Sequence, residues 1–164
     1  MDSEEFDVLY RTSFGSLVAQ VYAMCGNRAE AQDCVQEAFI RAWDKRHTLD
    51  RASSPEGWLR TTAYRIAVSR WRRSRLARRA PDRALQQERA VEPPDIESVA
   101  LTRALQRLPV EQRRVIVLHH LADLPVAEVA REVGAPEGTV KARLSRGRAA
   151  LAHLLSESER SEHR

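Results

Sequence analysis

Residues 125–151 read PVAEVAREVGAPEGTVKARLSRGRAAL, and this stretch decides how the C-terminal end of the chain folds. Its first part has helical apolar spacing from Pro125 to Gly134, which predicts a short helix that ends at the glycine. After a turn at residues 135–137, apolar residues recur at helical spacing in a second, longer helix. These residues are Val140, Leu144, Gly147, Leu151 and Leu154. Two helices joined by a tight turn that contains glycine predict a helix-turn-helix.

The second helix places polar and basic side chains opposite its apolar stripe. Because the first turns of a recognition helix reach base edges in the major groove, Lys141 and Arg146 are expected to touch bases or their flanking phosphates. The free amides at the start of the helix suit a phosphate oxygen. The full set predicted to bind duplex DNA is Thr139, Lys141, Ala142, Arg143, Ser145, Arg146 and Arg148. A solvated basic face is the alternative interpretation, and the complete helix-turn-helix pattern favours DNA.

Upstream of the helix-turn-helix, the C-terminal half is predicted to hold two more helices, one ending at Leu108 and one over about 110–121. Residues 80–97 contain three prolines and no sustained helical period, and Pro93-Pro94 excludes a continuous helix there. We therefore expect four segments: a domain over 1–79, a flexible linker over 80–97, a second domain over 98–156 and a tail over 157–164.

The N-terminal half is predicted to form three helices. The first has helical spacing up to Gly26, and the second begins at Asn27, with Glu30 three residues on as in a capping box. Ser54-Pro55-Glu56 begins the third, with an N-cap residue, a proline and an acid in that order. No segment alternates as a strand over more than a few residues. The fold class is therefore expected to be all-α, with two small helical domains.

The charge balance is modest but unevenly distributed. The 164 residues hold 27 basic and 23 acidic side chains, a formal net charge of +4. Residues 1–75 carry +2, residues 76–98 carry −1 and residues 99–164 carry +3. Of the basic residues 25 are arginine, which suits phosphate recognition but is also typical of a genome of high GC content. A net charge this small predicts weak, salt-dependent DNA binding by the chain alone.

Several classes of protein are excluded or disfavoured by composition. No apolar run is long enough to cross a membrane, and the acidic N-terminus does not resemble a signal peptide, so a cytoplasmic protein is expected. Cys25 and Cys34 are too few for a disulfide framework and are expected to be buried thiols rather than a redox switch. His119 and His120 are adjacent and make a poor metal pair. With no nucleotide-binding or catalytic motif, we expect no enzyme, no metal and no cofactor.

The sequence also resembles a known family at several points. Residues 33–43, DCVQEAFIRAW, resemble the D-x-V-Q-E-x-F-x-x-A-W pattern in region two of bacterial sigma factors. Trp58-Leu59 and the helical run that follows resemble the promoter-melting segment of that region. Leu108-Pro109-x-x-Gln112-Arg113-x-Val115 resembles the start of region four, and residues 138–144 resemble its recognition helix. Because only these two regions are present, the chain resembles an extracytoplasmic-function sigma factor.

This resemblance implies a function and a set of partners. A sigma factor binds core RNA polymerase, at the beta-prime clamp and the beta flap, and directs initiation at promoter DNA. The N-terminal domain would hold polymerase and open the minus-ten element, and the C-terminal domain would bind the minus-thirty-five element. An anti-sigma factor is an expected further partner. The residues that would bind polymerase are Asp33, Gln36, Glu37 and Arg41.

The third helix carries residue types that suit melted DNA. Aromatic faces stack on unpaired bases and arginines follow the phosphates. The predicted minus-ten residues are Trp58, Arg60, Tyr64, Arg65, Arg70, Trp71, Arg72 and Arg73. Trp58 has an alternative role as a core anchor. The family's I-A-R-N is replaced here by residues 62–65, TAYR, and Pro136 and Ala142 stand where serine is common, so the promoter sequence cannot be copied from a relative.

Two other classes of function remain open from the residues alone. A stand-alone helix-turn-helix regulator could share the C-terminal domain, and it would act as a dimer on a palindrome. A helical adaptor would bind only protein. The first leaves the 33–43 helix without a role, and the second leaves the basic face at 141–148 unused.

Overall fold

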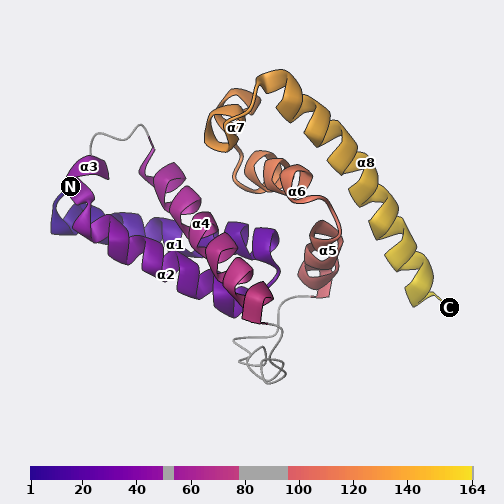
Figure 1. Cartoon of the computed structure of the whole chain (residues 1–164), viewed down its shortest axis with the longest axis horizontal. Coiled ribbons are helices and arrows are strands. Elements are labelled where there is room, and N and C mark those ends of the chain that lie inside the picture. The colour runs from indigo at the N-terminus through magenta and orange to yellow at the C-terminus, as the bar shows by residue number, and fades with distance from the viewer. Residues whose placement is uncertain (50–53, 78–95, 164) are drawn as a thin grey trace. The chain divides into compact units, whose positions relative to one another are not determined.

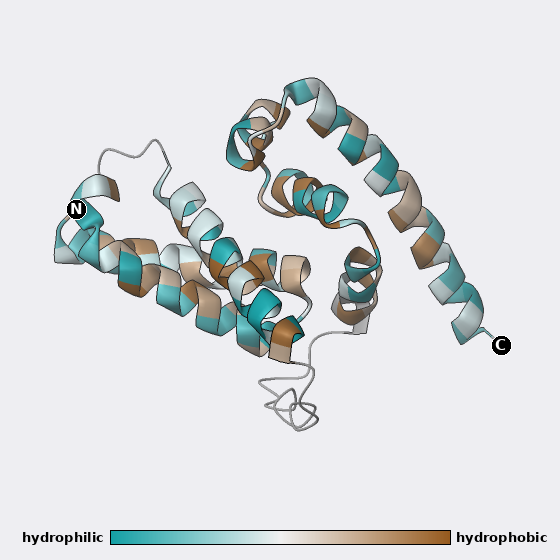
Figure 2. Cartoon of the chain, in the orientation of Figure 1, coloured by the Kyte–Doolittle hydropathy of each residue, from teal (hydrophilic) through white to brown (hydrophobic). Residues whose placement is uncertain are grey.

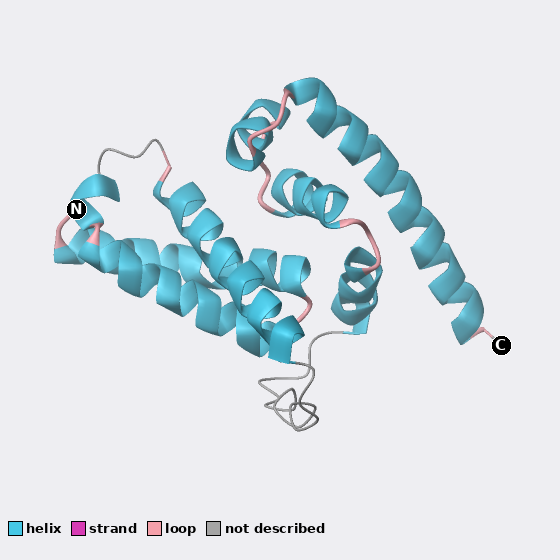
Figure 3. Ribbon diagram, in the orientation of Figure 1, coloured by secondary structure: helices cyan, strands magenta, loops and turns pink. Residues whose placement is uncertain are grey.

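The computed structural model describes residues 1–49, 54–77 and 96–163 (Figure 1). The chain divides into two compact units, residues 1–93 and 94–164. Every regular element in the described residues is a helix, which confirms the all-α prediction (Figure 3). None of these helices is both long and apolar enough to cross a bilayer. Most of the predicted linker over 80–97 lies outside the described residues.

The first unit contains three long helices and one single-turn helix. They are α1 (Ser3–Cys25), α2 (Arg28–Asp44), α3 (Arg46–Leu49) and α4 (Pro55–Ala77). The short α3 was not expected from the sequence. The predicted stop at Gly26 is confirmed, since this residue has φ 77° and closes α1.

Side chains at the helix starts fix where each long helix of the first unit begins. Asn27 Oδ1 accepts from the Glu30 amide at 2.9 Å, and Ser54 Oγ accepts from the Gly57 amide at 3.0 Å. Asp2 and Glu5 form a reciprocal capping box at the start of α1, a feature not predicted from the sequence.

The core of the first unit lies where α1, α2 and α4 pack together. Val21, Val35 and Leu59, one from each helix, are fully buried. Burying a side chain of this size contributes about 1.5–3 kcal/mol. Hydrophobic and hydrophilic residues alternate along α2, because one side of this helix packs in the core and the opposite side faces solvent (Figure 2). The three-helix core thus fixes which faces of α2 and α4 remain exposed.

The second unit holds four α-helices and one π-helical turn. They are α5 (Ile96–Gln106), α6 (Val110–Ile116), the π turn η2 (Val117–Leu121), α7 (Val126–Val133) and α8 (Glu137–Glu162). The sequence predicts a single helix over about 110–121, and the structure continues α6 into the π turn. Gly134, at φ 68°, closes α7 where the sequence places the stop.

A glycine sets the approach of α6 to α8. A Cβ on Gly147 would lie 2.5 Å from Ile116 Cδ1, closer than packed carbon atoms allow. Glycine at this position lets the two helices pack closely, with Val140 and Leu144 buried on the same side of α8. The opposite side of α8 therefore faces solvent in this unit.

Candidate nucleic-acid and polymerase interfaces

The start of α8 separates a buried side from a polar side, as the sequence predicts. Val140, Leu144 and Gly147 are buried against the second unit. The exposed side carries Lys141, Ala142, Ser145 and Arg146. Two basic side chains therefore flank two small ones on an open surface, within the first turns of the helix.

The remaining predicted duplex-binding residues are less uniformly exposed. Thr139 and Arg143 are half-buried, and Arg148 is exposed. Arg148 Nε donates to His120 Nε2 of the π turn at 2.9 Å. The N-cap of α8 is Pro136, which makes no side-chain cap bond. The first amides of α8 therefore have no hydroxyl or carboxylate cap at this position, as the sequence predicts.

The predicted polymerase residues share one face of α2. Asp33, Gln36 and Arg41 are exposed, and Glu37 is half-buried. Arg41 Nε lies 3.3 Å from Glu37 Oε1, an exposed i,i+4 ion pair. Such pairs contribute about 0.3–0.5 kcal/mol, so the face gains little rigidity from it.

This α2 face also contains an apolar residue that was not among the predicted polymerase residues. Ile40 is 56% exposed, although it follows the buried Phe39. Helical geometry places it beside Gln36 and Glu37, which lie four and three residues earlier. An exposed large aliphatic side chain within a polar face is typical of a protein-binding surface. The signal in the sequence was an isoleucine one position off the apolar stripe of α2.

The predicted minus-ten residues of α4 differ in exposure, and one of them, Arg60, is buried. Arg65, Trp71, Arg72 and Arg73 are exposed, and Trp58, Tyr64 and Arg70 are half-buried. Trp58 packs against the core of the first unit, in agreement with its alternative role as an anchor. The Arg75 guanidinium lies over the Trp71 ring, 5.0 Å from its centroid, and Trp71 is 53% exposed.

Arg60 differs from the expectation. It is only 4% exposed, and its Nη1 donates to Gln20 Oε1 of α1 at 3.2 Å. Gln20 in turn donates to Ser16 Oγ at 3.0 Å. Since a buried guanidinium requires such partners, Arg60 ties α4 to α1 inside the unit and is not placed to contact DNA.

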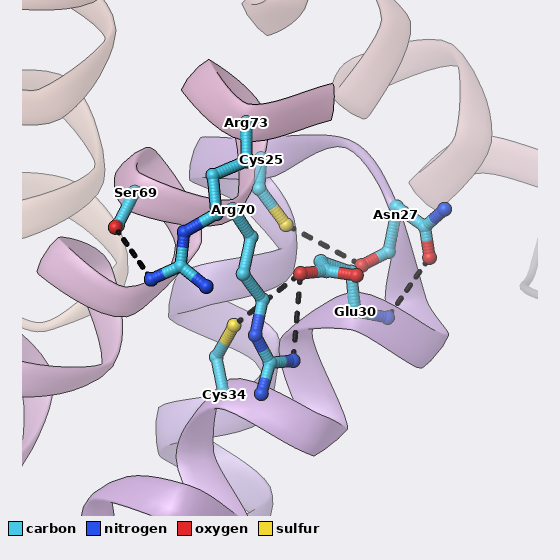
Figure 4. Close-up of polar contacts among 7 residues, drawn as sticks. All are labelled: Cys25, Asn27, Glu30, Cys34, Ser69, Arg70 and Arg73. Carbon is cyan, nitrogen blue, oxygen red and sulfur yellow. Dashed lines mark hydrogen bonds and ion pairs between the residues drawn. The ribbon is translucent and has the colours of Figure 1, made fainter. Parts of the chain in front are cut away.

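A hollow of about 580 Å³ lies between α2 and α4, and most of its polar lining is basic. Arg41, Arg65, Arg70 and Arg73 line it, together with Glu37. Arg70 Nη1 lies 3.5 Å from Glu30 Oε1, and Arg73 donates to Ser69 Oγ at 3.4 Å (Figure 4). The structure thus brings together arginines from the predicted polymerase face and from the predicted DNA helix.

Both cysteines lie beside this ion pair (Figure 4). Cys25 is half-buried and donates to the Asn27 carbonyl at 3.3 Å. Cys34 is fully buried and its Sγ lies 3.8 Å from Glu30 Oε1. Burial, aided by the nearby Glu30 carboxylate, raises the pKa of the Cys34 thiol to about 12.

A thiol-labelling experiment tests the chemistry of these cysteines. At pH 8 the thiolate fraction of Cys34 should be about a thousandfold lower than that of an ordinary thiol. We therefore expect an alkylating reagent to modify Cys25 first and Cys34 only after unfolding in denaturant, as mass spectrometry of the labelled peptides would show. Equal labelling rates in the native protein would contradict this expectation.

No cluster of three or more potential metal ligands occurs among residues 1–49, 54–77 and 96–163. His119 and His120 use their ring nitrogens separately. His119 Nδ1 lies 2.8 Å from the Leu124 carbonyl, and His120 Nε2 accepts from Arg148.

Family comparisons agree with this geometry. The model described as Sigma-70 region 2 matches residues 9–77, and Sigma-70, region 4 matches residues 98–151. A helical unit with an exposed α2 face, followed by a helix-turn-helix unit, thus defines a promoter-recognising sigma factor. Neither the stand-alone regulator nor the adaptor is favoured.

Individual relatives define the family more narrowly. The chain is 32% identical over 162 residues to the ECF RNA polymerase sigma factor SigM of Mycobacterium tuberculosis, covering 94% of this chain and 79% of the relative. It is 34% identical over 150 residues to SigW of Bacillus subtilis, covering 79% of this chain and 78% of the relative. The chain belongs to the ECF RNA polymerase sigma factors.

A solved structure shares the fold. The sigma factor RpoE from Bartonella quintana, solved in complex with the anti-sigma factor NepR, matches with a TM-score of 0.79 at 24% identity. The match covers 93% of this chain and 98% of that chain.

Proposed function

We propose that α8 recognises the minus-thirty-five element as duplex DNA. One observation carries this assignment: the first turns of α8 bury Val140 and Leu144 and expose Lys141 and Arg146 on the opposite side. Guanidinium and ammonium groups pair with guanine O6 and N7 in the major groove. Ala142 and Ser145 leave room for base edges between them. Thr139, Arg143 and Arg148, at the margins of this face, suit phosphate contacts, which position the helix without specifying sequence.

We also propose that α4 and the basic hollow capture the opened minus-ten strand. Trp71 offers an exposed ring for stacking, with the exposed Arg65 before it and Arg72 and Arg73 after it on the same helix. Tyr64 and Arg70 are half-buried at the edge of this surface. Arg60 is left out of the assignment because it is buried against α1.

The α2 face is assigned to core RNA polymerase, at the beta-prime clamp. Asp33, Gln36, Glu37 and Arg41 supply polar contacts, and Ile40 adds an apolar centre. An apolar centre with a polar rim is the usual anatomy of a protein interface. The second unit is expected to reach the beta flap.

These assignments imply a division of the chain and its setting in the cell. Residues 1–79 would serve polymerase and minus-ten binding, and residues 98–156 would serve minus-thirty-five binding. Residues 80–97 would be a linker and 157–164 a tail. The chain would act in the cytoplasm and would not itself be an enzyme. RpoE was solved with an anti-sigma factor, which supports proposing such a partner here.

Alanine variants of the α8 face test the duplex assignment. Transcription of genomic DNA with core polymerase and this chain would first define its promoters by their start sites. On such a promoter, Lys141→Ala or Arg146→Ala should each weaken duplex binding by about 1–3 kcal/mol and relax specificity at one position. Promoter-variant libraries would measure both effects.

Arg160→Ala is the matched control, because Arg160 is exposed near the other end of the same helix. It should leave specificity unchanged. A chain that gives core polymerase no promoter-specific initiation would contradict the function as a whole. Unchanged base preference in both α8 variants would contradict only the assignment of α8.

A further inference from the structure

His120 is placed to act on the recognition helix from outside it. It belongs to η2, and its Nε2 accepts from Arg148 Nε of α8 at 2.9 Å. The two residues are 28 positions apart in the sequence. The sequence shows the adjacent histidines and the basic face of the last helix separately. The contact between His120 and Arg148 depends on the packing of η2 beside α8.

The π turn gives His120 a fixed support. Val117 and Leu118 of the same turn are fully buried. His119 packs edge-on against His120 with ring centroids 4.9 Å apart, and its Nδ1 lies 2.8 Å from the Leu124 carbonyl. The π turn that carries His120 and the His119 ring beside it are therefore both held by the fold. The His120 ring itself is exposed. π-helical turns of this kind are frequent at functional sites.

The hydrogen bond occupies only one part of the arginine. Because Nε donates to His120, the N–H groups of Nη1 and Nη2 remain available for an anion. A free arginine side chain loses about 2 kcal/mol of rotamer entropy when it is fixed. An arginine already fixed at Nε loses less of this entropy when it binds a phosphate.

We propose that His120 is a positioning residue for DNA binding, which holds the Arg148 guanidinium so that its outer edge meets a backbone phosphate of the duplex on α8. The inference rests on the proposed role of α8. It adds to the helix-turn-helix a phosphate contact whose orientation is set by a residue outside the motif.

The protonation state of His120 agrees with an acceptor role. Burial lowers the pKa of His120 below its ordinary value of 6.5, and the charges of Arg148 and His119 lower it further. The ring is therefore neutral at pH 7, and an Nε2 acceptor requires the proton on Nδ1. Since the pKa is lowered, the acceptor is lost only as the pH falls below this reduced value. DNA affinity should then be flat between pH 7 and pH 8.

A double-mutant cycle tests the inference. With a promoter duplex as probe, His120→Ala and Arg148→Ala should each weaken binding by about threefold to tenfold, since one oriented phosphate contact is lost. In the Arg148→Ala background, His120→Ala should have no further effect. His120→Gln keeps an acceptor near Nε2 and should bind within about twofold of wild type.

Each other outcome has a distinct meaning. A His120→Ala effect that persists without Arg148 would show that His120 merely supports the fold, and overturn the inference. Affinity that rises from pH 7 to pH 6 in wild type but not in His120→Gln would make His120 itself the phosphate contact, which also overturns it. If the wild-type chain does not bind the promoter duplex at all, the proposed role of α8 would be overturned instead.

Discussion

Replacing Ile40 with aspartate should lower the affinity of the chain for core RNA polymerase by about thirtyfold or more. This corresponds to about 2 kcal/mol, the effect typical of an anchor residue at the centre of an interface. Ile40 is 56% exposed, so its removal costs the free protein little, whereas in a complex the new carboxylate would be buried without a partner. Competition binding against wild type would measure the change, and promoter-specific transcription at limiting chain concentration should fall with it.

Val8→Asp is the matched control for this variant. Val8 is 51% exposed on α1, outside the α2 face, so it carries a similar aliphatic surface with no assigned partner. All three tryptophans of the chain lie in the first unit, and their fluorescence reports whether either variant unfolds it. Equal loss of polymerase binding in both variants would contradict the role assigned to Ile40. If neither variant lost polymerase binding, the proposal that Ile40 lies at the centre of the polymerase-binding face would be wrong.

The exposed face of α8 could be predicted from the sequence because helical periodicity alone decides it. Once Val140 and Leu144 are assigned to the buried side, Lys141 and Ser145 follow on the other. The turn that begins α8 was also local information, carried by Gly134 and Pro136. Predictions that depend on one helix and its own caps were therefore the accurate ones.

Arg60 shows where such reasoning fails. It directly follows Trp58 and Leu59 in the chain, and only the packing of α1 on α4 places Gln20 opposite it. The pairing of Arg148 with His120 is equally non-local, and the π turn that permits it has no signature in composition. Ile40 was overlooked for another reason, because one isoleucine beside an apolar stripe is indistinguishable from part of the core until its exposure is known.

The charges of the second unit bear on how the chain finds DNA. Residues 99–164 carry a net charge of only +3, so the duplex contacts depend on placement rather than on a large field. With few charges, each duplex contact would contribute a larger share of the affinity, so the proposed preorganisation of Arg148 would matter more. If the α2 face binds polymerase as proposed, it would supply the rest of the affinity by bringing the chain to DNA together with polymerase.

Replacing Arg113 with alanine should destabilise the second unit by about 2–4 kcal/mol, because it removes hydrogen bonds to three carbonyls at once. Arg113 Nε donates to the Leu105 carbonyl at 2.8 Å, and Nη2 donates to the carbonyls of Gln106 and Leu108 at 3.1 Å. The carbonyls of Leu105 and Gln106 belong to the last turn of α5, and that of Leu108 lies just beyond it. Carbonyls at a helix end have no amide of a following turn to bind, so a side chain can supply the donor. One arginine on α6 therefore closes the end of α5 and fixes the corner between the two helices.

The two-unit architecture makes this prediction separable from general damage. Circular dichroism reports the unfolding of both units, whereas tryptophan fluorescence reports only that of the first unit. Arg113→Ala should therefore shift the dichroism transition to lower denaturant and leave the fluorescence transition unchanged. Arg113→Lys should lie between alanine and wild type, since an ammonium cannot span all three carbonyls. Arg107→Ala, an exposed arginine at the same corner, should have little effect. Coincident shifts in both signals would mean that the units unfold together, and an unshifted dichroism curve would mean that the corner is held by packing alone.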